Sequence, residues 1–533
     1  MQMNGARALL ESLKAEGVEV VFGYPGGAVL TLYDEVYKMN FPHVLTRHEQ
    51  GAAHAADGYA RASGKVGVAF ATSGPGATNL VTGIATAHMD SVPMVCITGQ
   101  VANPYIGKDS FQEADIVGIT TPITKHNYLV KDVNDIPRVV KEAFYIARTG
   151  RPGVVVIDVA KDVFDTPIDY EYPDAALLHG YTGDVPFDMD AVHAAAEALA
   201  SARQPLLFVG GGVVLSDTAA YVRELIALTG MPSVATLMGI GGVAAETEGY
   251  TGMAGMHGAY ASNMAIQECD LLLALGTRFS DRVTGNTAAF APKAKIVHFD
   301  IDPAELNKNV RADIPVIGDL RETLPAFVDA VRAVQDDLSV RYRPWRGEVL
   351  SMERAHPLRW KASEDIRPEE LISRVRELVD ADAICVTDVG QHQMWAAQFF
   401  GCHDPRRFLT SGGLGTMGYG LPAAIGAKLA CPEREVVLIT GDGSIMMNCQ
   451  ELATMADNDV DVKIVIVHNS ILGMVGQWQR LFYSHHYSAS ELKGKTDFVK
   501  LAEAMGVAGC RIETREEFAE VLPQVLRAKG ARL

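Results

Sequence analysis

Short runs rich in β-branched and other apolar residues alternate along the chain with longer stretches that have the pattern of amphipathic helices. In the first third of the chain these runs cover residues 18–22, 66–70, 94–97 and 153–157. Runs that are apolar throughout are typical of strands buried on both faces of a parallel sheet. The stretches between them are long enough for crossover helices. The sequence therefore predicts an α/β fold of doubly wound parallel sheets.

Two polar, proline-containing stretches interrupt this alternation, at residues 170–190 and 339–368. We interpret both as linkers. The strand pattern resumes after each of them, first at 205–209, 271–275 and 295–299, then at 384–387, 435–439 and 462–467. At ~100–200 residues per domain, a chain of 533 residues also holds about three domains. The predicted domains are residues 1–170, 190–338 and 368–533.

The charge balance limits the partners that this chain can have. Its 47 basic and 65 acidic residues give a formal net charge of −18, and no basic run is interleaved with aromatic residues. Nucleic acid and anionic membranes are therefore not expected to bind. No apolar run reaches the ~18 residues of a membrane span, and the N-terminus lacks the pattern of a signal peptide. We expect a cytoplasmic protein.

Polar residues follow two neighbouring strands of the last predicted domain. One strand leads into Gly441-Asp442-Gly443-Ser444, and the next ends at His468-Asn469, which is 27 positions beyond Asp442 (469 − 442). This spacing leaves room for one crossover helix, so both side chains can meet at the carboxyl edge of one sheet. Their oxygens suit Mg²⁺, and the glycines let backbone N–H groups approach a phosphate. A simple turn with a capping Asp is the alternative interpretation.

A second candidate is Glu49, at the start of a helix rich in small residues that covers residues 49–61. A carboxylate in the first turn of a helix is most often a capping group. From the residues alone, a cap and a functional acid are both open.

These segments together resemble the thiamine diphosphate enzymes, which have a glutamate segment like that at residues 47–61 and a Gly-Asp-Gly followed by Asn-Asn. The resemblance implies a pyrimidine-binding first domain and a diphosphate-binding last domain. It implies that Asp442, Asn469 and the Ile471 carbonyl hold Mg²⁺, with His468 replacing the first Asn. It further implies that Glu49 promotes the imino tautomer of the cofactor, that Met417 bends the cofactor and that Gly415 contacts its amino group. The other implied cofactor contacts are Gly390, Gln391, His392, Gly441, Gly443, Ser444 and Met474.

The central domain has glycine turns after its strands but no G-x-G-x-x-G, so on its own it is weak evidence for a dinucleotide. In their order these turns resemble the FAD-binding domain of the acetohydroxyacid synthases, a branch of the same family. Ser280 departs from the Asp that is common there. A domain of the same fold that binds no flavin is the alternative. The implied FAD contacts are Arg151, Gly211, Gly212, Thr236, Leu237, Met238, Gly255, His257, Gly276, Arg278, Arg282, Val283, Asp300, Ile301 and Asp319.

The same resemblance implies a site for 2-ketoacids. Arg282 would bind a carboxylate, and Trp478 would favour the larger acceptor 2-ketobutyrate. Phe111 would also contact substrate, and Gln112 and Lys161 match positions that act in catalysis.

The resemblance implies decarboxylation of pyruvate on thiamine diphosphate and condensation of the hydroxyethyl carbanion with pyruvate or 2-ketobutyrate. This reaction is the first common step of branched-chain amino-acid synthesis. A flavin-dependent pyruvate oxidase and a non-catalytic binding protein are the alternatives. In this family Glu49 of one chain serves the cofactor that Asp442 of another chain anchors, which implies at least a homodimer. A homotetramer and a small regulatory subunit are further implied.

Overall fold

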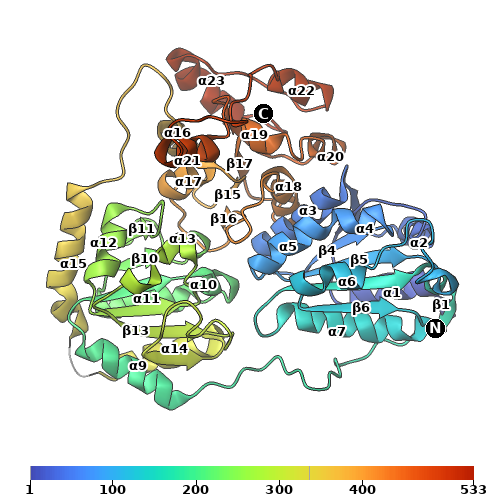
Figure 1. The fold of residues 1–533 in the computed structure, drawn as a ribbon, viewed down its shortest axis with the longest axis horizontal. Helices are drawn as coiled ribbons and strands as arrows, with labels where there is room; N and C mark the ends of the chain where they lie inside the picture. Colours follow the sequence, from blue (N-terminus) through green and yellow to red (C-terminus); the bar gives the residue numbers. More distant parts are fainter. Residues whose placement is uncertain (1, 335–336) are drawn as a thin grey trace. The chain divides into compact units, whose positions relative to one another are not determined.

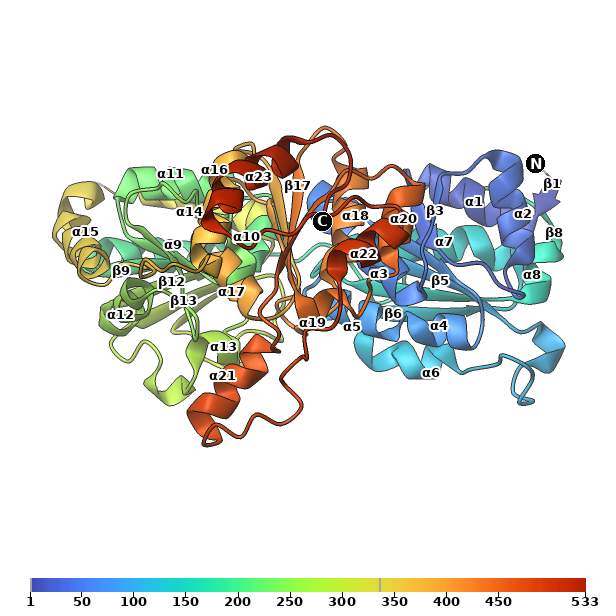
Figure 2. The same cartoon turned by 90° about the horizontal axis from the view of Figure 1, so that it is seen from above.

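The computed structural model describes residues 2–334 and 337–533. The chain forms two compact units. The first unit comprises Met1–Gly183, Ile384–Gln393 and Leu409–Leu533, and the second comprises Asp184–Ala383 and Met394–Phe408. The first unit contains two larger sheets and one two-stranded antiparallel sheet, and the second unit contains one sheet, with helices packed on both faces of the larger sheets (Figures 1 and 2).

The N-terminal sheet of the first unit has six parallel strands in the order β3-β2-β4-β5-β7-β6. Its strands are β2 (Val21–Gly23), β3 (His43–Leu45), β4 (Gly67–Ala71), β5 (Met94–Gln100), β6 (His126–Val130) and β7 (Val154–Ala160). Along β7, Val155 and Ile157 pack with α1 (Gly5–Ala15) and α7 (Ile136–Arg148). Val154 and Val156 pack on the other face with α3 (Glu49–Ser63) and α5 (Val81–Met89). Both faces are buried, which explains the uninterrupted apolar runs.

The second sheet of the first unit has the order β16-β15-β17-β18. Its strands are β15 (Ile384–Thr387), β16 (Phe408–Leu409), β17 (Val436–Gly441) and β18 (Lys463–Val467). β15 pairs with β17 in parallel, and β17 pairs with β18, so that Gly441 and Val467 are neighbours. The carboxyl ends of these strands therefore lie along one edge. The core on this sheet includes residues of α18 (Gly420–Ala430), α20 (Glu451–Asp457) and α22 (Phe498–Ala504).

Helix α3 joins the two sheets of the first unit by packing directly on α18. The contact is between backbones, because a Cβ at Gly58 would overlap the carbonyl oxygen of Ala423, and a Cβ at Gly426 would overlap that of Ala55. The absence of side chains at these two positions lets the helices touch. The remaining elements of this unit are β1 (Gln2–Asn4), β8 (Pro167–Asp169), α2 (Leu30–Met39), α4 (Pro75–Asn79), α6 (Ile116–Thr120), α8 (Lys161–Asp165), α19 (Asp442–Ile445), α21 (Gly473–Phe482) and α23 (Arg515–Arg527).

The sheet of the second unit has six strands in the order β11-β10-β9-β12-β13-β14, all parallel. The strands are β9 (Pro205–Val209), β10 (Ser233–Ala235), β11 (Tyr250–Met253), β12 (Leu271–Leu275), β13 (Lys295–Asp300) and β14 (Ile314–Ile317). In sequence order this is 3-2-1-4-5-6, the arrangement of dinucleotide-binding folds. The order reverses between β9 and β12, where such folds bind their ligands.

Helices cover both faces of this sheet. One core includes residues of α9 (Met189–Ser201), α11 (Ala219–Thr229) and α14 (Leu320–Arg332), and the other includes residues of α12 (Tyr260–Glu268) and α15 (Leu338–Ala355). The other helices are α10 (Gly211–Leu215), α13 (Asp281–Thr284) and α16 (Pro368–Leu378), and α17 runs over Gln391–Phe399. Within the described residues, every helix is too short or too polar to span a bilayer.

The predicted strands at 205–209, 271–275 and 384–387 agree residue for residue with β9, β12 and β15. The interpretation of 339–368 as a linker was wrong for its first half, because residues up to Ala355 form α15. Tyr342 and Trp345 are buried there, and the indole N–H of Trp345 donates to the carbonyl oxygen of Pro205 at 2.9 Å. Pro344 misled the prediction, since proline inside a helix removes a backbone hydrogen bond.

Candidate functional site

The carboxylate of Asp442 joins the ends of β17 and β18. Its Oδ1 accepts the N–H of Gly443 at 2.9 Å, and its Oδ2 accepts the N–H groups of Asn469 at 3.2 Å and Ser470 at 2.6 Å. The side-chain oxygen of Asn469 accepts the N–H of Ile471 at 3.2 Å. The structure thus brings Asp442 and Asn469 together, as their spacing predicts. Their role as metal ligands stays a prediction.

These donors suit a magnesium ion that bridges the protein to a phosphate. Asp442 is the one acidic residue of the segments 441–444 and 468–474, which otherwise offer an amide side chain, two serine hydroxyls and backbone carbonyls as oxygen ligands. Mg²⁺ is commonly held by one or two carboxylates while water and phosphate oxygens complete its shell. His468 Nε2 lies 3.8 Å from Asp442 Oδ2, and its ring packs on Phe498. The histidine therefore has a packing role beside the carboxylate.

His392 lines a cradle at the end of β15. A Cβ at Gly441 would lie 2.8 Å from His392 Nδ1, and one at Gly390 would lie 2.7 Å from its Cε1. The Nε2 atom of this buried ring has no hydrogen-bond partner. Burial lowers the pKa of His392 to about 4, so the ring is neutral. The unpartnered Nε2 of His392 and the space left by Gly390 and Gly441, which have no side chains, fit a diphosphate at this position.

Further predicted contacts lie around the same cradle. The hydroxyl of Ser444 donates to the carbonyl oxygen of Val389 at 2.7 Å, which ties the Gly-Asp-Gly segment to the loop of His392. A Cβ at Gly473 would overlap the amide oxygen of Gln391. Met474 is the next residue of α21. The helix that begins at Asp442 is α19, which has only four residues. An anion here can therefore bind individual backbone N–H groups, but it gains little from a helix dipole.

Met417 lies beside Gly443. Its Cε is 3.8 Å from the position of a Cβ at Gly443. Gly415, two residues earlier, has a φ of +70°, a conformation that favours glycine. The loop between β16 and α18 thus brings Met417 next to the Gly-Asp-Gly segment.

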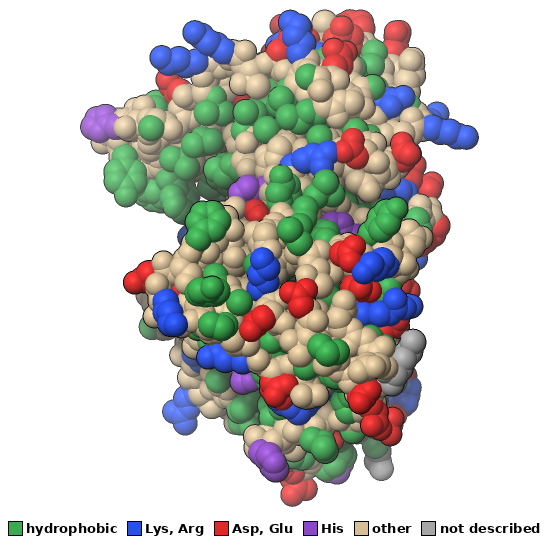
Figure 3. Space-filling model, turned by 90° about the vertical axis from the view of Figure 1, so that its right-hand side faces the viewer, with side chains coloured by type: hydrophobic (Ala, Val, Ile, Leu, Met, Phe, Trp, Pro, Cys, Tyr) green, Lys and Arg blue, Asp and Glu red, His purple; other side chains and the backbone are tan. Residues whose placement is uncertain are grey.

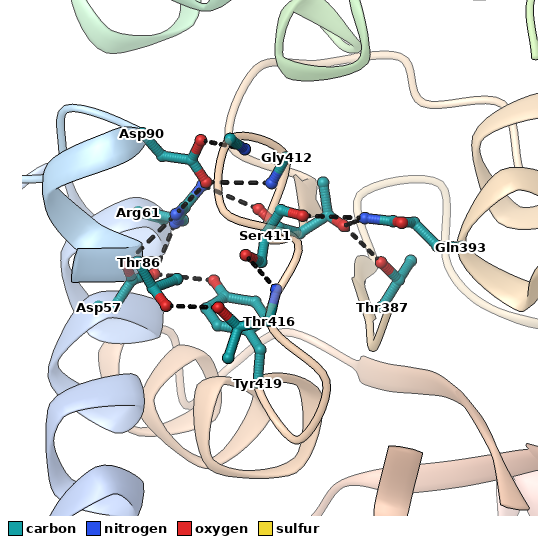
Figure 4. A network of polar contacts seen from close by, with 12 residues as sticks. Asp57, Arg61, Thr86, Asp90, Thr387, Gln393, Ser411, Gly412, Thr416 and Tyr419 are labelled. Atoms are coloured by element: carbon teal, nitrogen blue, oxygen red, sulfur yellow. Dashed lines mark hydrogen bonds and ion pairs between the residues drawn. The ribbon is translucent and has the colours of Figure 1, made fainter. Parts of the chain in front are cut away.

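A buried polar network fastens this loop to helices α3 and α5 (Figure 4). Arg61 of α3 pairs with Asp57 at 2.5 Å and with Asp90 at 2.9 Å, and donates to the carbonyl oxygen of Thr410 at 3.0 Å. The carboxylate of Asp90 also accepts the backbone N–H groups of Gly412 and Gly413, at 3.1 and 2.7 Å. The loop is therefore held by charge-assisted hydrogen bonds in a site closed to water.

The same network reaches both ends of the loop. The hydroxyl of Tyr419 donates to Asp57 at 2.8 Å, and the hydroxyls of Thr86 and Thr416 are hydrogen-bonded at 2.7 Å. Arg61, Asp57 and Tyr419 are all buried. The position of the Met417 loop is therefore coupled to that of α3.

Glu49 is the first residue of α3, but it is not the cap. The N-cap is His48, whose Nδ1 accepts the N–H of Gln50 at 3.1 Å. Glu49 is 8% exposed, and its Oε2 accepts the side-chain amide of Asn79 at 2.9 Å. Burial, and next the charge of Glu49, raises the pKa of Tyr33. The carboxylate remains available for another role.

Gln112 approaches the same corner of the N-terminal sheet. Its φ is +58°, and its carbonyl oxygen lies 2.7 Å from the position of a Cβ at Gly74. At Gly76, two residues after Gly74, a Cβ would lie 3.2 Å from Glu49 Oε1. The turn at Gly74–Gly76 thus separates the two predicted catalytic residues.

In the second unit, glycines from two strands meet where the strand order reverses. A Cβ at Gly212 would lie 2.7 Å from the α-carbon of Gly276. Thr236 follows β10 and accepts the N–H of Gly239, and Asp300 ends β13 and accepts the N–H of Asp302. Gly255, with a φ of +107°, packs against the carbonyl oxygen of Arg282. The other predicted flavin contacts that follow these strands are Gly211, Leu237, Met238, His257, Arg278, Val283 and Ile301.

Two predicted flavin contacts lie elsewhere. Asp319 caps α14 and pairs with Arg321. Burial by itself would raise the pKa of Asp319, but its hydrogen bonds with Arg321 outweigh burial and lower the pKa. Arg151 belongs to the first unit, where its Nε donates to the hydroxyl of Ser91 at 2.8 Å. The remaining glycine-rich set fits a nucleotide at the point where the strand order reverses.

The predicted substrate residues are exposed and belong to both units. Phe111 is 88% exposed and Trp478, on α21, is 37% exposed. Lys161 is the exposed first residue of α8. Arg282 lies on α13 of the second unit, its guanidinium 3.8 Å from the sulfur of Met256.

The sequence analysis missed Asp388 and Asn448, which are buried beside the Met417 loop, and Asn79, the partner of Glu49. Asp388 follows β15 directly, as Asp442 follows β17, and this position was the available signal. Burial raises the pKa of Asp388 to about 6. Nothing in the local pattern marks the other two.

Comparison with known families gives three matches in sequence order. Residues 3–119 match the N-terminal TPP binding domain of the thiamine pyrophosphate enzymes, residues 192–327 match their central domain, and residues 388–533 match their C-terminal TPP binding domain. Thiamine pyrophosphate is another name for thiamine diphosphate. The matched segments contain Glu49, the glycine turns of the second unit, and Asp442 with Asn469.

Individual relatives cover the whole chain. The acetolactate synthase of Mycobacterium leprae (strain TN) is 49% identical over 530 residues, which are 98% of this chain and 85% of that protein. The acetolactate synthase isozyme 2 large subunit of Escherichia coli (strain K12) is 46% identical, over 100% of this chain and 95% of that protein. A probable acetolactate synthase large subunit of Methanocaldococcus jannaschii is 48% identical, over 98% of this chain and 90% of that protein. The chain therefore belongs to the acetolactate synthase family of thiamine diphosphate enzymes.

Proposed function

We propose that this chain joins two 2-ketoacids after decarboxylating one of them. Pyruvate loses CO₂, and the remaining two-carbon unit forms a carbon–carbon bond with pyruvate or 2-ketobutyrate. The products are acetolactate or acetohydroxybutyrate, with no net oxidation. The observation that carries the proposal is the convergence of Asp442, Asn469, His392 and Met417 at one sheet edge.

When bound, thiamine diphosphate supplies the carbon nucleophile and accepts the electron pair left by decarboxylation. Asp442, Asn469 and the Ile471 carbonyl would hold Mg²⁺ against its diphosphate. The N–H groups at 441–444 would donate to phosphate oxygens, and Nε2 of His392, which has no partner in this structure, would donate to another when it carries the ring proton. Gln391, Gly390 and Met474 would close this cradle.

Glu49 would hold a proton at its carboxylate and exchange it with the cofactor's pyrimidine ring, since it is buried and is not needed as a cap. Met417 would support the bent cofactor. The carbonyl oxygen of Gly415 would accept a hydrogen bond from the amino group of the cofactor. These are roles of orientation and proton transfer.

For the substrates, Arg282 would bind a ketoacid carboxylate with two parallel hydrogen bonds. Trp478 and Phe111 would provide apolar contacts, worth ~1–3 kcal/mol for the extra methylene of 2-ketobutyrate. Gln112 and Lys161 would complete the site.

We also propose FAD as a largely structural cofactor of the second unit. Its strand order and the contact between Gly212 and Gly276 support a dinucleotide at the carboxyl ends of β9 and β12. Ultraviolet and visible spectra of the purified protein, before and after incubation with FAD, test this directly.

The proposed assembly is a homodimer or homotetramer in the cytoplasm, with a small regulatory subunit as a further partner. The E. coli relative is named a large subunit, which supports such a partner. The net charge of −18 argues against nucleic acid, and the face drawn in Figure 3 mixes basic with acidic side chains.

The test is incubation with pyruvate, Mg²⁺, thiamine diphosphate and FAD, with acetolactate and oxygen measured together. Acetolactate without oxygen uptake is expected. Peroxide in the absence of acetolactate would instead indicate oxidation of pyruvate.

The shared site can be tested by mixing two inactive variants. Glu49→Gln and Asp442→Asn damage different halves, so a mixed dimer would have one intact site. If both variants assemble freely, mixing should restore about a quarter of the wild-type activity. No recovery after verified subunit exchange would show that each site is built from a single chain.

A further inference from the structure

The peptide group of Gly418, directly after Met417, is held from both sides by buried side chains. Its N–H donates to Oδ1 of Asp388 at 2.8 Å, and its carbonyl oxygen accepts the Nδ2 of Asn448 at 2.7 Å. Asp388 and Asn448 are each 1% exposed, so water cannot take their place. Gly418 has a φ of +88°, and a Cβ there would lie 2.8 Å from the Cβ of Met447. The turn after Met417 is therefore fixed in one conformation.

Asp388 also joins the other segments of the diphosphate cradle. The same Oδ1 accepts the N–H of Val389 at 2.8 Å, where the loop to His392 begins. The carboxylate further accepts the N–H of Gly420, and its Oδ2 lies 3.5 Å from the hydroxyl of Thr440. Thr440 directly precedes the Gly-Asp-Gly segment. One carboxylate thus links the ends of β15 and β17 to the Met417 turn.

We propose that Asp388 and Asn448 form a clamp that sets the position of Met417 over the diphosphate cradle, and thereby the bend of the bound cofactor. The inference rests on the proposed function. Both are positioning residues, since they act through the Gly418 peptide. Misplacement of a supporting group by ~1 Å can slow a reaction by about 10²-fold.

The clamp can be broken without releasing the whole loop. The segment from Thr410 to Gly413 is held separately by Arg61 and Asp90. Loss of the Asn448 side of the clamp should therefore loosen the Met417 turn, while Asp388 keeps its bonds to the segments of the cradle. This separates the proposal from a general role in stability.

The first measurement is backbone deuterium uptake in the protein without cofactor. Asn448→Ala should raise uptake in the segment 411–419 by about tenfold in rate, because the Gly418 carbonyl loses its buried donor. Asn458→Ala is the control, since the Nδ2 of this exposed residue also donates to a backbone carbonyl, that of Thr454 in α20, and does not touch the segment 411–419. Unchanged uptake in Asn448→Ala would overturn the clamp whatever reaction the protein catalyses.

The second measurement separates cofactor binding from cofactor activation. In Asn448→Ala, the Kd of thiamine diphosphate with Mg²⁺ should stay within about threefold of wild type, because Asp388 keeps its hydrogen bonds to Val389 and Thr440. Hydrogen–deuterium exchange at the reactive carbon of the bound cofactor should slow by about 10²-fold. An equal loss of binding and exchange, or wild-type exchange in Asn448→Ala, contradicts the positioning role.

The two failures can be told apart. If wild type neither binds thiamine diphosphate nor exchanges its proton, the proposed function is wrong and the positioning role falls with it. If wild type does both and Asn448→Ala behaves as Asn458→Ala, only the clamp is wrong.

Discussion

Gly426 of α18 and Ala55 of α3 are in backbone contact, since a methyl group at Gly426 would overlap the carbonyl oxygen of Ala55. The matching contact on the other side, at Gly58, makes the crossing tight from both helices. Substitution here cannot be absorbed by a flexible side chain, because the nearest atoms belong to backbone.

Gly426→Ala should lower the free energy of unfolding by about 1–3 kcal/mol or more, because the helices must separate to admit the methyl group. Urea unfolding followed by circular dichroism measures the change. Gly347→Ala is the control, since Gly347 lies in α15 with open space around its α-carbon. This control should be neutral or more stable by about 0.5–1 kcal/mol. Equal effects of both substitutions would contradict the packing argument.

Arg61→Leu should destabilise the first unit strongly. It leaves the carboxylates of Asp57 and Asp90 buried without their cation, a loss of about 3–5 kcal/mol. Tyr419→Phe removes only one hydroxyl donor to Asp57 and should lose about 1–2 kcal/mol. Thermal unfolding should rank the proteins as wild type, Tyr419→Phe, Arg61→Leu. If Arg61→Leu lowered the free energy of unfolding by less than ~0.5 kcal/mol, as a substitution at the surface does, the buried network would be contradicted.

Asp158 gives a prediction for the pH dependence of stability. It is 1% exposed, accepts the hydroxyl of Thr98 and the amide of Gln100, and burial raises its pKa from 3.8 to about 6. The folded chain thus keeps a proton that the unfolded chain loses as the pH rises above 3.8. This contribution to stability is complete below that pH, declines as the pH rises, and is gone above about pH 6.

Asp158→Asn does not titrate, so the stability of wild type relative to it should fall by about 3 kcal/mol between pH 4 and 7. Urea unfolding of both proteins across this range measures the difference between their free energies of unfolding. The other acidic residues titrate alike in both proteins, so their contributions cancel in this difference. Asp169→Asn, an exposed substitution on β8, should follow wild type. A constant difference between wild type and Asp158→Asn would show that the carboxyl titrates normally.

Removal of the divalent cation should strongly weaken cofactor binding. The segments 388–392, 441–444 and 469–474 contain no Lys or Arg, and His392 is neutral. The metal is then the main charge opposite the diphosphate. Chelation with EDTA should weaken thiamine diphosphate binding by about 10²-fold or more, measured by equilibrium dialysis. Asp442→Asn should do the same in the presence of Mg²⁺, and tight metal-free binding would contradict the proposed cradle.

Local patterns predicted much of this fold. The apolar runs gave β9, β12 and β15 because strands buried on both faces leave an uninterrupted signal. The spacing of Asp442 and Asn469 predicted their contact because consecutive parallel strands end on the same edge. Helix α15 was missed because Pro344 and its arginine neighbours hide two buried aromatic residues.

The supporting residues of the site could not be predicted in the same way. Arg61 and Thr410 are 349 positions apart, and Asp388 is separated from Gly418 by 30 positions and from Thr440 by 52. Such contacts depend on how α3 packs on α18 and on where the loop before α18 turns. Neither is encoded in a periodic pattern.

Helix α3 carries Glu49 at its first residue and Arg61 near its last, and Arg61 is bound to the loop that bears Met417 in the same chain. In the proposed dimer Glu49 serves the cofactor of the neighbouring subunit. A movement of the Met417 loop when one site binds its cofactor would therefore shift α3, and with it the Glu49 carboxylate in the site of the neighbouring subunit. Loading of the two centres would then be cooperative, although they share no ligand.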